Sequence, residues 1–133
     1  MIRDHLIAAI KQRFPDAPFS FGEPPEPVAS LSSPCMALGQ MQICDDGDEA
    51  TIYFSNATHG HFNCADEKLT EEQKEQQIAG DVIEFVDAVL KDQAVIWQAA
   101  GGLAGGWRVL QPNEPTPKPS LVRKQFLWSR EIS

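Results

Sequence analysis

The chain has 133 residues, of which 42% are hydrophobic and 23% are charged, and its formal net charge at pH 7 is -8. This length suits one compact domain, and the composition lies far from the low-hydrophobicity range of disordered chains, so we expect a single domain over residues 1–133. Residues 15–50 carry seven carboxylates and no Lys or Arg. Such a field repels a phosphate backbone, so nucleic acid is not an expected ligand.

The cysteine count and the hydropathy pattern bear on the cellular compartment. The three cysteines, Cys35, Cys44 and Cys64, form no C-x-x-C pair, and an odd count is typical of a reducing environment. The apolar run near the N-terminus is short and is flanked by Asp4 and Lys11, unlike a secretory signal. No run of 18 apolar residues occurs. The sequence therefore predicts a cytoplasmic protein without a membrane partner.

The first element expected along the chain is a short amphipathic helix that ends before Pro15. Its apolar residues recur at helical spacing: Ile2, Leu6, Ile7 and Ile10. Residues 15–34 then contain six prolines. Because proline lacks a backbone donor and favours extended geometry in its predecessor, we expect an irregular arm here with one edge strand at residues 19–21.

Three strands are expected next, as an antiparallel meander. Residues 35–44 and 50–55 are joined by a cluster of turn formers around Gly47, which favours a hairpin. A turn at Asn56 would lead to the third strand at residues 58–63.

A long helix follows and begins with a capping box. Thr70 and Gln73 have the spacing at which each side chain bonds the other's backbone amide. Apolar residues then occupy one side of the helix, and Gly80 within it predicts close packing against a strand. The opposite side is acidic: Glu71, Glu72, Glu75, Asp81, Glu84 and Asp87.

The C-terminal part predicts more strands. Residues 94–98 and 107–110 read as two strands around a glycine-rich loop. Residues 111–119 carry four prolines and predict a stiff connector to a final strand at 121–128. This element order predicts an α+β, two-layer sandwich in which both helices pack on one face of a mainly antiparallel sheet.

Residues 58–64, THGHFNC, contain the strongest candidate for a chemical site. His59 and His61 share one face of a strand and are candidate metal ligands, although the spacing dictates no third ligand. Cys64 falls on the opposite face if the strand continues. The alternative is that both histidines are polar side chains on the solvent face of the meander. No cofactor motif occurs, because the glycine-rich loop lacks the G-K-[ST] of a phosphate-binding loop.

Two candidate partner-binding surfaces emerge instead. The glycine-rich loop is flanked by Trp97 and Trp107, with Arg108 beside it, and such residues are typical of contact surfaces. The acidic helix face, including Glu84 and Asp87, suits electrostatic docking of a basic protein, although a solvated exterior explains it equally.

In size, charge and element order the chain is similar to small bacterial partner-binding proteins, such as immunity proteins that neutralise toxins and acidic secretion chaperones. This similarity implies a non-catalytic protein-binding module. The alternative is a metal-dependent or thiol enzyme centred on His59, His61 and Cys64. A homodimer formed through an exposed sheet edge is compatible with either function.

Overall fold

A computed structural model describes residues 1–55, 57–102 and 104–133. Asn56, in the predicted turn before the third meander strand, and Leu103, in the glycine-rich loop, lie outside the described residues. The described parts of the chain form two helices and two antiparallel sheets, which agrees with the predicted α+β class. The helices are α1 (Ile2–Arg13) and α2 (Glu71–Leu90).

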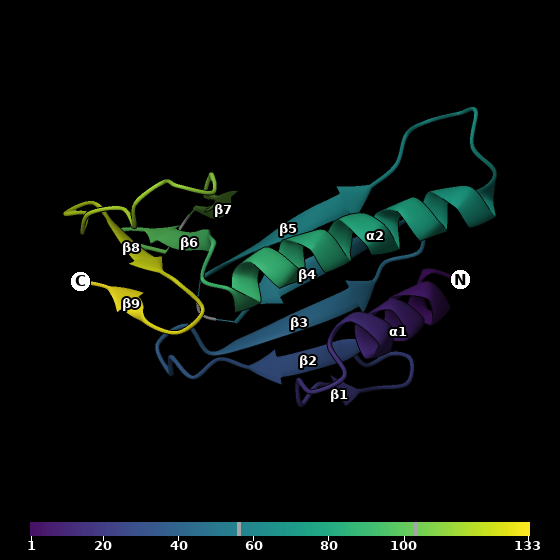
Figure 1. Ribbon diagram of the computed structural model, residues 1–133, viewed down its shortest axis with the longest axis horizontal. Coiled ribbons are helices and arrows are strands. Elements are labelled where there is room, and N and C mark those ends of the chain that lie inside the picture. Colours follow the sequence, from purple (N-terminus) through teal and green to yellow (C-terminus); the bar gives the residue numbers. More distant parts are fainter. Residues whose placement is uncertain (56, 103) are drawn as a thin grey trace.

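The larger sheet has five strands in sequence order, and both helices lie on one of its faces (Figure 1). Its strands are β1 (Ser20–Phe21), β2 (Ala29–Ser32), β3 (Gln40–Asp45), β4 (Glu49–Phe54) and β5 (Thr58–Asn63). Alternate side chains such as Met41, Ile43 and Ile52 are buried against the helices and form one core with them. The other face carries Tyr53 and His59, which are exposed. The predicted three-strand meander is confirmed as β3, β4 and β5.

The smaller sheet was not expected, because the sequence predicts a single sheet. It has four strands in the order β7-β6-β8-β9: β6 (Ala94–Ala99), β7 (Gly105–Val109), β8 (Arg123–Phe126) and β9 (Glu131–Ile132). The side chain of Trp107 on β7 packs against Phe62 of β5 and Phe85 of α2. The two sheets are therefore joined by side-chain packing at this place and not by a shared hydrogen-bond ladder.

The capping box of α2 is confirmed in both directions. The Gln73 amide donates to Thr70 Oγ1 at 3.1 Å, and the Thr70 amide donates to Gln73 Oε1 at 2.9 Å. The expectation for Gly80 is wrong. A Cβ at Gly80 would meet nothing within 4 Å, because the glycine lies on the solvent side of α2, away from buried residues such as Val82 and Val86.

The proline-rich arm over residues 15–34 is more structured than its composition suggests. The predicted edge strand is present as β1, but β2 was missed, although Ala29 and Leu31 are buried. The Arg3 side chain holds the loop between them by donating to the carbonyls of Gly22 and Glu26, the latter at 2.7 Å. One long side chain of α1 thus fixes the position of a loop that lacks a ladder of its own.

The C-terminal segment also differs in detail from the expectation. The final strand, predicted at residues 121–128, is shortened to β8, and Leu121 and Val122 are exposed. Phe126 and Trp128 are buried. In the described parts of the chain, neither helix combines the length and the apolar character needed to cross a membrane.

Candidate functional site

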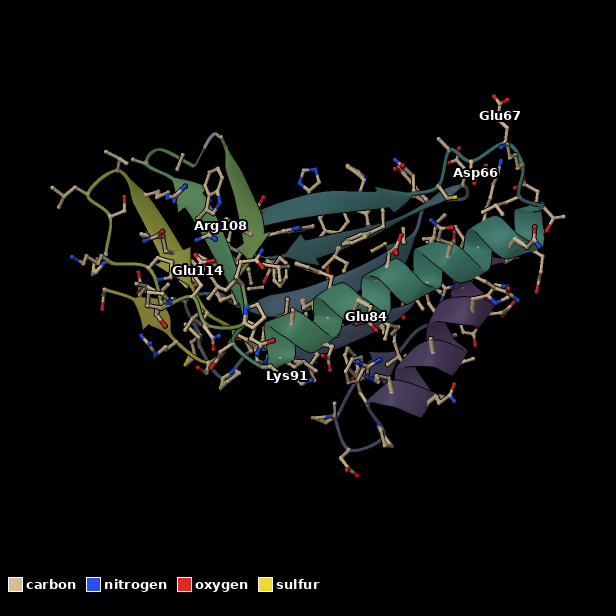
Figure 2. The ribbon with its side chains drawn as sticks, turned by 45° about the horizontal axis from the view of Figure 1, so that its top comes forward. Asp66, Glu67, Glu84, Lys91, Arg108 and Glu114 are labelled. Atoms are coloured by element: carbon tan, nitrogen blue, oxygen red, sulfur yellow. The ribbon has the colours of Figure 1, made fainter. Side chains whose placement is uncertain are left out.

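Most carboxylates gather at one end of the molecule, which we call the acidic end. It is formed by the start of α1, the β3–β4 connection, the loop after β5 and the first turns of α2 (Figure 1). Its ten acidic residues are Asp4, Asp45, Asp46, Asp48, Glu49, Asp66, Glu67, Glu71, Glu72 and Glu75. The cationic groups that oppose them are the side chains of Arg3, Lys68 and Lys74 and the ammonium of Met1. Figure 2 places Asp66 and Glu67 at this end, far from Arg108 and Glu114.

The acidic end contains a groove between α2 and the β4–β5 hairpin, with a volume of about 490 Å³. Four carboxylates line it, from Asp48, Glu49, Glu71 and Glu75. Lys74 is the cationic side chain of the lining, whereas Ile2 and Ile78 lie behind it and are almost fully buried. The groove is therefore polar and strongly negative.

Several of these carboxylates already have partners within the chain. Lys74 Nζ lies 3.7 Å from Glu71 Oε1, and the Met1 ammonium lies 3.4 Å from Glu75 Oε1. Since Glu71 is 87% exposed, its pair with Lys74 is weakened by solvent. A cationic side chain of a partner could replace Lys74 in this pair at a small cost in free energy.

Sequence reasoning missed this groove because its walls come from segments far apart in the chain. The acidic residues of the β3–β4 turn and those around the α2 cap are about twenty residues apart. Only the antiparallel pairing of β4 with β5 brings Glu49 opposite Asn63, next to the start of α2. The available signal was the presence of two dense acidic clusters, one at a predicted turn and one at a predicted helix start.

The two predicted metal ligands lie on the face of β5 that no helix covers. The rings of His59 and His61 are in edge contact, with centroids 5.3 Å apart, and His59 stacks on Tyr53 at 5.3 Å. His61 Nδ1 lies 3.0 Å from Thr51 Oγ1 and 3.5 Å from Glu49 Oε1.

A chain of hydrogen bonds determines which ring nitrogen of the neutral His61 side chain carries the proton. The Thr51 hydroxyl donates to the Asp46 carboxylate, and a hydroxyl has one proton to give. His61 Nδ1 is therefore the donor to Thr51, which leaves Nε2 of the neutral imidazole as the unprotonated nitrogen. The geometry makes Nε2 of His61 a competent ligand or base, whereas a third protein ligand close to both histidines is not found among the described residues.

Cys64 lies on the other side of the sheet from the histidines, as the strand parity predicts. It packs against the core near α2 and lines the acidic groove. The three side chains of the proposed enzyme site therefore do not converge.

Burial raises the pKa of the Cys44 thiol, the Asp46 carboxylate raises it further, and Arg3 opposes both effects. A thiol of this kind is protonated and weakly nucleophilic.

The two tryptophans around the glycine-rich loop occupy different environments. Trp107 is half-buried and forms an aromatic cluster with Phe54, Phe62 and Phe85, to which its ring centroid is 6.0, 5.8 and 4.4 Å away. Trp97 lies beneath Arg123, whose guanidinium carbon is 4.8 Å from the ring centroid. Both tryptophans are half-buried, but Trp107 packs against the core, whereas Trp97 packs beneath Arg123.

Arg108 is engaged by Glu114 of the proline-rich connector, as Figure 2 shows. Its Nη1 donates to Glu114 Oε1 at 2.9 Å, and Nη2 lies 2.6 Å from Oε2. Hydrogen bonding from Arg108 lowers the pKa of Glu114, a backbone bond from Gln111 lowers it further, and Glu114 in turn raises the pKa of Arg108. This bidentate pair fastens the connector to β7.

Glu84 and Asp87 on α2 are also paired within the chain. Arg13 of α1 reaches both, with Nη1 3.1 Å from Glu84 Oε1 and Nη2 3.5 Å from Asp87 Oδ1. Lys91 adds a second contact to Asp87 at 2.9 Å. These two carboxylates therefore help to hold α1 against α2, in contrast to the less compensated acidic end.

Comparison with known proteins adds no relative: no protein-family model, no curated protein and no solved structure matches this chain.

Proposed function

We propose that the chain is a non-catalytic protein-binding module, immunity- or chaperone-like, whose acidic end binds a basic segment of another protein. The observation that carries this proposal is the groove at the acidic end, which four carboxylates line. The cationic head of a partner's arginine or lysine fits such a groove chemically, because it pairs with the carboxylates.

The charge distribution supports the proposal beyond the groove itself. Ten carboxylates within one end of a small molecule create a field that attracts a basic partner before contact and raises the association rate. Such attraction falls with ionic strength, because the Debye length shrinks to about 8 Å at physiological salt. Binding should therefore weaken as salt is added.

Two double variants separate the acidic end from the rest of the acidic surface. Asp48→Asn/Glu71→Gln removes two exposed charges beside the groove, whereas Asp81→Asn/Glu84→Gln removes two exposed charges elsewhere on α2. Since an exposed ion pair contributes about 0.2–1 kcal/mol, we expect the first variant to weaken binding by about 3- to 10-fold. The second should bind like the original chain.

The measurement begins with capture of a partner from a host lysate at low salt. The purified partner is then titrated calorimetrically against all three proteins at two salt concentrations. Equal affinity of the three proteins, or no partner at low ionic strength, would contradict the proposal. The control variant also tests whether Glu84 belongs to the binding surface.

A second copy of the chain is one specific candidate for the basic partner. Residues 94–133 carry five Lys or Arg side chains and two carboxylates, so the smaller sheet is the basic end of the molecule. Sedimentation at low and high salt tests this arrangement. Association that disappears with salt, and with Asp48→Asn/Glu71→Gln, would identify the partner as another copy.

A metal-dependent or thiol enzyme is the second candidate function. It is favoured by the Asp46–Thr51–His61 hydrogen-bonded chain, which places the proton of the neutral His61 imidazole on Nδ1. Because Cys64 lies on the opposite face from the histidines, a metal-dependent enzyme is favoured over a thiol enzyme. Elemental analysis of the purified protein with and without His59→Ala decides: stoichiometric metal that the variant lacks would place this function first.

A further inference from the structure

A second group of potential metal ligands lies away from β5, at the contact between the two helices. It is formed by His5 of α1 with Glu72 and Glu75 of α2, whose ligating atoms all lie within 4.8 Å of one another. His5 Nε2 is 3.3 Å from Glu72 Oε1 and 3.9 Å from Glu75 Oε1. Among the described residues this is the one group of three or more such side chains.

We propose that His5, Glu72 and Glu75 form a binding site for a divalent transition metal, with Zn²⁺ as the best fit. Zinc binds imidazole nitrogen and carboxylate oxygen at about 2.0–2.2 Å, so two ligands of a tetrahedral ion lie about 3.4 Å apart. The separation of His5 Nε2 from Glu72 Oε1 is 3.3 Å, close to this value. The carboxylate of Glu75 needs only a small side-chain movement to reach the same ion.

The packing of α1 against α2 restricts the positions of these ligands. Glu72 and Glu75 are three residues apart and so lie on the same side of α2, facing α1. The side chains of His5 and Glu75 are only 23% and 20% exposed, and His5 is next to the fully buried Leu6. Two ligands are thus positioned by packing, and the third, Glu72, is 64% exposed and adjusts freely.

The donor set also indicates which ion binds. Carboxylates at the start of a helix are explained by the helix dipole alone, without any cation. The imidazole nitrogen is the feature that distinguishes this group, because Ca²⁺ and Mg²⁺ prefer oxygen ligands, whereas Zn²⁺ and its neighbours accept nitrogen readily. Three protein ligands leave one tetrahedral position for water.

The test is calorimetric titration of the full, chelator-treated chain with zinc chloride. We expect one Zn²⁺ per chain, and a loss of affinity of at least about tenfold in both His5→Ala and Glu72→Gln. The matched control is His59→Ala/His61→Ala, which removes two imidazoles from β5 and should leave the affinity unchanged. Because Glu72 is exposed, Glu72→Gln decides the matter even if His5→Ala fails to fold.

Thermal unfolding gives a second reading, since the ion would join α1 to α2. Zinc at about one hundred times its dissociation constant should raise the unfolding midpoint by about 10 °C in the original chain and in the His59/His61 variant. No such rise should occur in Glu72→Gln. Absence of zinc binding, or loss of binding in the His59/His61 variant alone, would overturn the proposal.

The proposed zinc site shares Glu75 with the acidic groove, but the two proposals are tested separately. The zinc titrations contain no partner, and partner binding is measured with a chelator present. A negative result in one experiment therefore does not contradict the other proposal.

Discussion

Replacing Gly60 with Ala tests how the two sheets are joined. Gly60 lies on β5 directly beneath the Trp107 ring, and an added Cβ would lie closest of all to Cη2 of that ring, 2.6 Å from Cζ2 and 2.8 Å from Cζ3. Real Cβ atoms do not approach so closely, so Trp107 must move by more than 1 Å, as judged from an ordinary contact of about 3.5–4.0 Å.

The loss of stability follows from the aromatic contacts that Trp107 loses when it moves. Its ring contacts Phe54, Phe62 and Phe85, and each aromatic pair contributes about 0.5–1.5 kcal/mol beyond area burial. Overpacking itself costs about 1–3 kcal/mol. Against this, alanine gains about 0.5–1 kcal/mol over glycine within a strand. We therefore expect Gly60→Ala to lower the free energy of unfolding by about 3 kcal/mol.

Urea unfolding measures this change as a fall in the midpoint of roughly 1–2 M. Gly80→Ala is the matched control, because its Cβ meets nothing within 4 Å and alanine is favoured in a helix by about 1 kcal/mol. It should stabilise the chain.

A double-mutant cycle with Trp107→Leu isolates the clash. In that background Gly60→Ala should cost less than about 1 kcal/mol, because leucine leaves room for the methyl group. Strictly additive effects would refute the assignment of the Gly60 cost to Trp107.

Three further predictions concern single side chains. Thr70→Ala removes the acceptor of the Gln73 amide and should lower the free energy of unfolding by about 1 kcal/mol in urea titrations. The Glu114 carboxyl should titrate by NMR below its ordinary pKa of 4.5. The ion pair between Glu114 and Arg108 is therefore fully formed above pH 4.5 and is lost as the pH falls through the lowered pKa of Glu114. Arg108→Gln should return the pKa of Glu114 toward 4.5. Cys44 should react with iodoacetamide at pH 8 more slowly than a cysteine in an unfolded peptide, since burial raises its pKa; an equal rate would contradict this.

The sequence predicts best those elements that depend on local signals. The capping box at Thr70 and Gln73 places the start of α2 correctly, because both of its hydrogen bonds form within four residues. The turn formers around Gly47 likewise predict the hairpin of the meander. The missed strand β2 lies among prolines, and its residues are extended because Leu31 and its neighbours pair with β3 and pack in the core, an influence that local composition does not reveal.

The candidate sites show the same division between local and distant information. The strand parity that separates Cys64 from His59 and His61 is local, and it was predicted correctly. By contrast, His5 stands 67 positions before Glu72 in the chain and meets it only because α1 packs on α2. The role of Trp107 in the interior was missed for the same reason. Its neighbours Phe54, Phe62 and Phe85 come from three other elements.

The acidic end should lower the stability of the folded chain, and added salt should reduce this destabilisation. Ten carboxylates opposed by three cationic side chains repel one another in the folded state. We expect sodium chloride up to about 0.3 M to raise the unfolding midpoint by screening this repulsion. At low salt, Asp48→Asn/Glu71→Gln should also be more stable than the original chain.

The control variant should respond differently, because it removes a carboxylate, that of Glu84, which is paired with Arg13. Asp81→Asn/Glu84→Gln breaks the pair between Glu84 and Arg13, so it should be no more stable than the original chain at any salt concentration. A molecule that keeps a destabilising cluster of charge around a groove is consistent with selection for binding over stability. If removing charge at the acidic end stabilised nothing, the repulsion would be negligible, and so would the field proposed to attract a basic partner.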